Sequence, residues 1–161
     1  MRRSFKGLIA AMAIALLAGC SSQPSHSMFP PTLGVQQLRV TPDGHWHMRM
    51  RILNNSYGSM DFRRLQLTMT INGKPAAHID TRFKLDIAPL SADLTNVDIA
   101  PSQAASKALA AIADEGSSGN LAYTLTGTAT AIPEGEKKLR QFKVKSRDWL
   151  SPVPGVANTY R

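Results

Sequence analysis

The sequence has a single cysteine, few aromatic residues and no apolar run long enough to cross a bilayer. One cysteine, Cys20, cannot form an internal disulfide, which excludes a disulfide-stapled scaffold. Aromatic residues make up 6% of the chain, too few for the stacking platforms of proteins that bind single-stranded nucleic acid. The apolar run at residues 8–18 has 11 residues, whereas a transmembrane helix needs about 20. With 43% hydrophobic and 19% charged residues among 161, the composition is that of a compact globular protein.

Residues 1–19 resemble the signal peptide of a bacterial lipoprotein. Three basic residues stand before the apolar run, and the run ends in Leu-Ala-Gly-Cys at 17–20, which resembles a lipobox. In lipoproteins the cysteine thiol accepts a diacylglycerol before cleavage, so the resemblance implies a lipidated Cys20 as the first mature residue, anchored by its acyl chains. Ser21, rather than Asp, follows it, which favours a periplasm-facing position on the outer membrane over the inner membrane. An ordinary secretory signal with an incidental cysteine is the alternative.

The remaining chain divides into a tether, one domain and a tail. Three of the 19 basic residues and none of the 11 acidic ones lie in residues 1–19. The mature part therefore keeps 16 basic and 11 acidic residues, a net charge of +5. Residues 20–31 are the lipidated cysteine followed by a Ser/Pro-rich tether. Residues 32–146 carry the patterns of a folded domain, and 147–161, with two prolines, are predicted to be an irregular C-terminal tail.

Apolar and polar residues alternate along much of the chain, which predicts β-strands with one wet face. Around residue 48, for example, Trp46, Met48 and Met50 alternate with Arg49 and Arg51. Short strands at this spacing predict an all-β antiparallel sandwich or barrel of about seven strands. The predicted strands cover residues 33–40, 45–52, 63–71, 76–85, 94–99, 121–131 and 139–144.

Two local features interrupt this pattern. Asn72-Gly73 supplies the residues that a two-residue type I′ hairpin turn needs, because both tolerate a positive φ. Residues 101–115 are Ala-rich, with an apolar stripe at helical spacing and Gly116 as a C-terminal cap, and they predict a single short helix.

The alternation also predicts which side chains form the core. Arg49, Arg51, Gln66 and Thr68 are expected to face water. The residues predicted to be buried are Trp46, Met48, Ile52, Leu65, Leu67, Met69, Tyr123 and Leu125.

The order of these features resembles the group 2 late-embryogenesis-abundant proteins and their WHy domain. The motif residues are Asn54, Leu67 with Asn72-Gly73, and Tyr-x-Leu-x-Gly at 123–127; Asn55 and Ser56 stand where the family has Pro and Asn. The resemblance implies a seven-stranded Greek-key sandwich, similar to fibronectin type III, with one short helix. It also implies a stress-protective or envelope role without catalytic machinery.

Candidate catalytic and metal sites are few. No nucleophile-elbow, zinc-protease, P-loop or CxxC motif is present, so we expect neither an enzyme nor a cofactor. His45 and His47 point to one side of a strand, and His78 could lie on a neighbouring strand, which would permit a surface metal site. Because no Cys, and no Asp or Glu of that strand face, joins them, we interpret them as solvated and expect no metal.

The basic residues are the main candidates for a binding surface. Arg49 and Arg51 share one strand face, and residues 137–147 hold six basic residues without an acid. Such residues either keep strand surfaces soluble or attract anionic lipid, lipid A phosphates or acidic polymers. Nucleic acid is not an expected partner. The candidate anion-binding residues are Arg49, Arg51, Lys137, Lys138, Arg140, Lys143, Lys145 and Arg147.

Two classes of function remain open. The first is a non-enzymatic, membrane-anchored envelope lipoprotein that stabilises membranes or client proteins under stress. The second is a module that binds lipid, or a protein partner in an envelope complex, through a basic face of the sandwich.

Overall fold

The structure is a computed structural model that describes residues 27–161, with one α-helix, one short 3₁₀ helix and eight strands in this part of the chain. The helical elements are α2 (Gln103–Asp114) and η1 (Gly116–Ser118). The strands are β1 (Thr32–Val40), β2 (Trp46–Leu53), β3 (Met60–Ile71), β4 (Lys74–Ile87), β5 (Ala92–Ile99), β6 (Leu121–Pro133), β7 (Arg140–Leu150) and β8 (Thr159–Tyr160).

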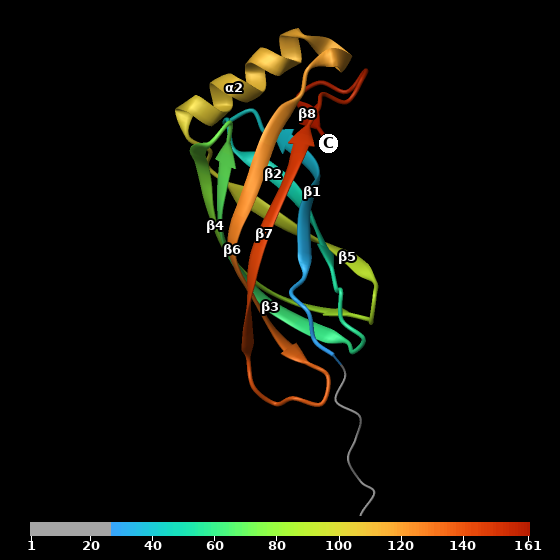
Figure 1. Cartoon of the computed structure of the whole chain (residues 1–161). Helices are drawn as coiled ribbons and strands as arrows, with labels where there is room; N and C mark the ends of the chain where they lie inside the picture. The colour runs from blue at the N-terminus through green and yellow to red at the C-terminus, as the bar shows by residue number, and fades with distance from the viewer. Residues whose placement is uncertain (1–26) are drawn as a thin grey trace, which may run out of the picture.

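The strands form two four-stranded antiparallel sheets that pack face to face (Figure 1). Sheet 1 has the order β5-β2-β1-β8 and sheet 2 the order β4-β3-β6-β7. Hairpins join β1 to β2, β3 to β4 and β6 to β7, whereas the other connections cross between sheets in the manner of a Greek key. The predicted all-β sandwich is therefore confirmed, with a short eighth strand in addition.

The C-terminal tail is the main error in the predicted organisation. Residues 147–150 continue β7, and β8 pairs with β1 at Leu38 and Arg39. Tyr160 is only 4% exposed, so the tail closes part of sheet 1. The prolines misled the prediction because they lie in the 151–158 loop, which only leads to β8, and not in a strand that they would break.

The predicted turn and helix are both present. Asn72 and Gly73 have φ values of 47° and 75° and join β3 directly to β4. The Ser102 hydroxyl caps α2 by accepting from the backbone N–H of Ala105 at 3.2 Å. Gly116, at φ 62°, ends the helix in the left-handed conformation. The helix lies across one end of the sandwich, which we call the helix end (Figure 1).

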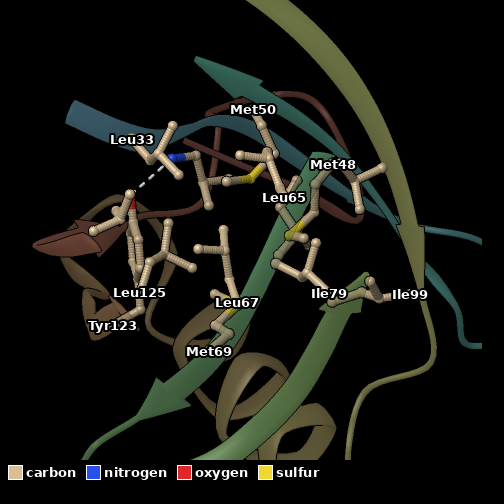
Figure 2. Packing of buried hydrophobic residues seen from close by; sticks show 14 of the residues in the cluster. Leu33, Met48, Met50, Leu65, Leu67, Met69, Ile79, Ile99, Tyr123 and Leu125 are labelled. Carbon is tan, nitrogen blue, oxygen red and sulfur yellow. Dashed lines mark hydrogen bonds between the residues drawn. The ribbon is translucent and has the colours of Figure 1, made fainter. Parts of the chain in front are cut away.

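The core lies between the two sheets, and the eight residues predicted to be buried are all at most 2% exposed. Met48 and Met50 reach in from sheet 1 and meet Leu65 and Leu67 from sheet 2 (Figure 2). Each fully buried large apolar side chain contributes about 1.5–3 kcal/mol to the stability of the fold. Of the residues predicted to face water, the two arginines are exposed and Gln66 and Thr68 are half-buried.

Residues 27–31 are not a free tether. The Ser56 hydroxyl accepts from the backbone N–H of Phe29 at 2.8 Å, and the Asn55 amide donates to the carbonyl of Pro30 at 2.8 Å. These residues are therefore fixed to the β2–β3 loop. The predicted signal peptide, Cys20 and the rest of the tether lie outside the described residues.

Candidate functional site

The predicted basic residues do not form one surface, because the structure places them in three separate regions. Arg49 and Arg51 lie on β2 and point outward from sheet 1. Arg39, which the sequence analysis did not select, lies on the same outer face, since β1 pairs it with His47. Its place in the predicted strand 33–40 was the signal that could have found it.

The second region is a row on β7. Lys143, Lys145 and Arg147 are exposed and alternate with Phe142 and Val144, whose side chains are both 5% exposed. This row lies on the outer face of sheet 2, beside Thr124, Thr126 and Thr128 of β6. Within residues 27–161, no carboxylate forms an ion pair with any of the three bases.

The third region is the β6–β7 hairpin, which contains Lys137, Lys138 and Arg140. Arg140 pairs with Glu136 at 3.3 Å, and its guanidinium lies 5.2 Å from the centre of the Phe142 ring. The two lysines have no ion-pair partner in the described part of the chain. Of the three basic residues in this hairpin, Arg140 alone is thus engaged by other side chains.

A flat membrane cannot contact the first two regions together. The sheets of a sandwich pack about 10 Å apart, and the two outer faces point in opposite directions. Arg51 and Arg147 approach one another only at the β1–β7 edge, where both line an open pocket of about 200 Å³ that also includes Asp148. The expectation of a single basic face is therefore corrected.

The histidines also lie apart. His45 contacts Asp43, and His47 contacts Asp98 of β5, a carboxylate that the sequence analysis did not place near it because β5 is distant in sequence. His78 lies on β4, in the other sheet. Among residues 27–161, no group of three His, Cys, Asp or Glu side chains could hold a metal ion.

Two exposed carboxylates, Asp43 and Asp80, have pKa values that are shifted by side chains in direct contact with them. The Thr41 hydroxyl, which donates to Asp43, lowers the pKa of that carboxyl. On the outer face of sheet 2, both oxygens of Asp80 accept from the Arg64 guanidinium, at 2.7 and 2.6 Å, and this pair lowers the pKa of Asp80. Both carboxylates are exposed, so these pairs contribute little to stability.

The end of the sandwich opposite the helix is held by a buried amide. Asn54 is 0% exposed, and its Nδ2 donates to the carbonyls of Gly58, Ile87 and Ala88 at 2.9–3.1 Å. Its Oδ1 accepts from the backbone N–H of Ser56 at 2.9 Å. Asn54 belongs to the motif that resembles the WHy domain, and in the structure it joins the β2–β3 loop to the β4–β5 loop.

We call this end of the molecule the Phe29 end and define it by residues 27–31 and the loops 54–59, 88–91 and 134–139. The three loops and the first described residues lie together at the end opposite α2 (Figure 1). Six large hydrophobic side chains of the described chain are exposed. Four of them belong to the Phe29 end: Phe29 (45%), Tyr57 (59%), Leu90 (60%) and Leu139 (62%).

No family model and no curated protein matches the sequence. Several solved structures resemble it, among them the following three. A solution structure of AT1g01470 from Arabidopsis thaliana is 10% identical to this chain and has a TM-score of 0.49. The match covers 84% of this chain and 85% of the Arabidopsis chain. A crystal structure of an Archaeoglobus fulgidus protein is 12% identical, with 79% of this chain and 100% of the other covered and a TM-score of 0.38. The X-ray structure of the Northeast Structural Genomics Consortium target SoR45 is also 12% identical, with 79% of this chain and 89% of the other covered and a TM-score of 0.42.

In the part of the chain that the structure describes, no helix is both long and apolar enough to span a membrane.

Proposed function

We propose that this chain is a non-enzymatic lipoprotein, anchored through Cys20 to the periplasmic side of the outer membrane, whose sandwich stabilises membranes or client proteins under stress. The observation that carries the anchor is the signal at residues 1–20: a basic start, an 11-residue apolar run and Leu-Ala-Gly-Cys. The stabilising role rests on the resemblance of the sequence motif to the WHy domain.

The geometry of the fold agrees with an anchor at the N-terminus. The first described residues leave the sandwich at the Phe29 end, and hydrogen bonds from the β2–β3 loop fix them there. A short segment separates them from Cys20. Attachment at Cys20 would therefore place one defined end of the sandwich near the bilayer.

Mass spectrometry of the mature N-terminus tests the anchor. We expect cleavage before Cys20 and an acyl modification on it, because alkylation of the thiol precedes cleavage in the lipoprotein pathway. Cys20→Ala should accumulate as an uncleaved, unacylated precursor. Cys20→Ser tests whether the thiol itself is required, since it keeps size and polarity and should fail in the same way. A free Cys20 in the mature protein, or cleavage at another bond, would refute the anchor and the localisation together.

A drying assay tests the stabilising role. The chain is dried with a labile enzyme, and the recovered enzyme activity is compared with that obtained with an unrelated β-sandwich at equal mass. We expect higher recovery with this chain. Equal recovery would leave the lipoprotein proposal in place and remove the stress-protective part of it.

A second function is favoured by the row on β7: binding of an anionic lipid or polymer. Three bases at i, i+2 and i+4 on one edge strand present a line of positive charge. Arg49→Glu/Arg51→Glu on the opposite face is the matched control for Lys143→Glu/Lys145→Glu. We expect only the β7 reversal to weaken binding to acidic vesicles at low salt, without lowering the melting temperature. Binding should also weaken near physiological salt, where the Debye length is about 8 Å. Equal effects of both reversals would contradict a site on β7.

A further inference from the structure

We infer that the Phe29 end is a membrane-docking surface, which rests on the bilayer that holds Cys20 and inserts Leu90 and Leu139 among its headgroups. This inference rests on the proposed lipid anchor and goes beyond it, because an anchored domain could equally stand clear of the bilayer. It assigns an orientation in which the strands rise from the membrane and α2 faces away from it.

The first observation is the chemistry of the Phe29 end. Three of its four segments, residues 27–31, 54–59 and 88–91, contain no charged residue, in a chain of which 19% is charged, and the charges of this end lie in the fourth segment, 134–139. Four of the six exposed large hydrophobic side chains belong to this end. Exposed apolar side chains that gather at one end of a molecule mark an interaction site, and aromatic rings with apolar neighbours are typical of the bilayer interface.

The second observation is that these side chains are held in place. Phe29 and Tyr57 pack edge to face, with ring centres 6.3 Å apart. Leu90 has a φ of 52°, a conformation that is uncommon for leucine, and its backbone N–H donates to the carbonyl of Ser56 at 3.2 Å. A 60% exposed leucine fixed in this way presents its side chain outward without a cost of ordering the loop on binding.

The third observation is the reach of the chain. Seven residue steps separate Cys20 from Ser27, which is at most about 25 Å even when fully extended. The 12 residues of β3 span about 40 Å, so the Phe29 end lies much nearer to the anchor than the helix end does. The occupant of this surface is therefore the bilayer that holds the acyl chains.

The charges on the β6–β7 hairpin fit an anionic bilayer. The carboxylate of Glu134 accepts from the backbone N–H of Ser59 at 2.9 Å, and Glu136 pairs with Arg140. Both acids of the loop thus have partners within the protein. Lys137 and Lys138 have no ion-pair partner among the described residues, so their ammonium groups are available to phosphate groups of the headgroups.

Nitroxide labelling of the full chain, lipidated in vivo and reconstituted into vesicles of phosphatidylethanolamine and phosphatidylglycerol, tests the inference. An acylated Cys20 has no free thiol, so Leu90→Cys and Leu139→Cys each offer a single labelling site. Val156→Cys is the matched control, because Val156 is 52% exposed in the 151–158 loop at the helix end. The accessibility of each nitroxide to oxygen and to a water-soluble nickel complex is measured by electron paramagnetic resonance.

We expect the labels at 90 and 139 to be at least two-fold more accessible to oxygen, relative to nickel, than the label at 156. Lys137→Glu/Lys138→Glu should reduce that ratio in the acidic vesicles but not in neutral phosphatidylcholine vesicles. If Cys20 is acylated and all three labels are equally accessible to nickel, the docking surface is refuted while the anchor stands. If the mass of the wild-type chain shows no acyl group on Cys20, the anchor fails and the docking surface fails with it.

Discussion

The hydroxyl of Tyr123 on β6 accepts a hydrogen bond from the backbone N–H of Val35 on β1, at 2.9 Å and across 88 residues of sequence. The bond is buried and joins the two sheets (Figure 2). It meets β1 where the pairing with β2 shifts register, between Val35 and Gln37, and where β8 does not cover the strand. Tyr123 therefore gives this buried backbone donor of sheet 1 a partner from sheet 2.

Tyr123→Phe should lower the free energy of unfolding by about 1–3 kcal/mol, because it leaves the buried N–H of Val35 without an acceptor while the ring still packs. Urea unfolding followed by circular dichroism measures the change. Tyr57→Phe is the control: its side chain is 59% exposed, so its stability should change by less than about 0.5 kcal/mol. A Tyr123→Phe variant as stable as the wild type would show that water or a local shift replaces this bond.

Stability should also fall at alkaline pH. Burial raises the pKa of Tyr123, with Asp148 adding to the effect and the Val35 N–H opposing it, and burial with Asp114 raises the pKa of Tyr160. The folded protein therefore keeps these two phenolic protons to a higher pH than the unfolded chain does. Their contribution to stability is fully present below pH about 10 and is lost as the pH rises through the folded-state pKa values. In a Tyr57→Phe background, which removes the exposed phenol, phenolate absorbance should rise together with unfolding, and Tyr160→Phe should make the alkaline loss less steep.

Gly127 occupies a position in β6 that no other residue fits. Its φ is 150°, and a Cβ there would lie 2.1 Å from the carbonyl oxygen of Gln66 on β3. Gly127→Ala should therefore push β6 away from β3 and destabilise the fold by more than about 3 kcal/mol, or prevent folding. Gly135→Ala, at φ 77° in open space, should cost only about 1–2 kcal/mol. Similar melting temperatures for the two variants would contradict the close contact between the strands.

The sequence predicted the features that arise from local chemistry. Alternation placed Trp46 and Leu67 in the core, and Asn72-Gly73 fixed the hairpin between β3 and β4, because each depends only on neighbouring residues. The family motif selected Asn54 and Tyr123, but their roles depend on loops and strands that are distant in sequence.

What the sequence could not supply was the assignment of strands to sheets. Arg49 and Lys143 were expected on one basic face, yet β2 and β7 belong to different sheets. Tyr160 was expected in an irregular tail, because two residues carry too little alternation to predict a strand that is formed by pairing with β1. The gathering of exposed apolar side chains at the Phe29 end was also missed, since it appears only when four separate segments meet.

Leu67→Ala should lower the free energy of unfolding by about 2–5 kcal/mol, because Leu67 is 2% exposed and its truncation leaves a cavity between the sheets. Leu139→Ala is the matched control, since the same change at a 62% exposed side chain creates no cavity. Denaturant unfolding with an unchanged m-value measures both. A loss below about 1 kcal/mol for Leu67→Ala would mean that the sheets close around the missing atoms.

Asn54→Ala should destabilise the protein by about 2–4 kcal/mol, since it removes the donor to three carbonyls at a fully buried position and the acceptor for the Ser56 N–H. Asn54→Asp keeps the acceptor but sets a carboxylate against those carbonyls, so it should cost at least as much at neutral pH. Asn55→Ala, which loses exposed hydrogen bonds, should cost less than about 1 kcal/mol. Hydrogen exchange should show faster opening of residues 88–91 in Asn54→Ala than in Asn55→Ala, because Asn54 holds that loop against the rest of the Phe29 end. Unchanged exchange there would show that backbone hydrogen bonds, from Leu90 N–H to the Ser56 carbonyl and from Asn54 N–H to the Ser91 carbonyl, are enough to hold the loop.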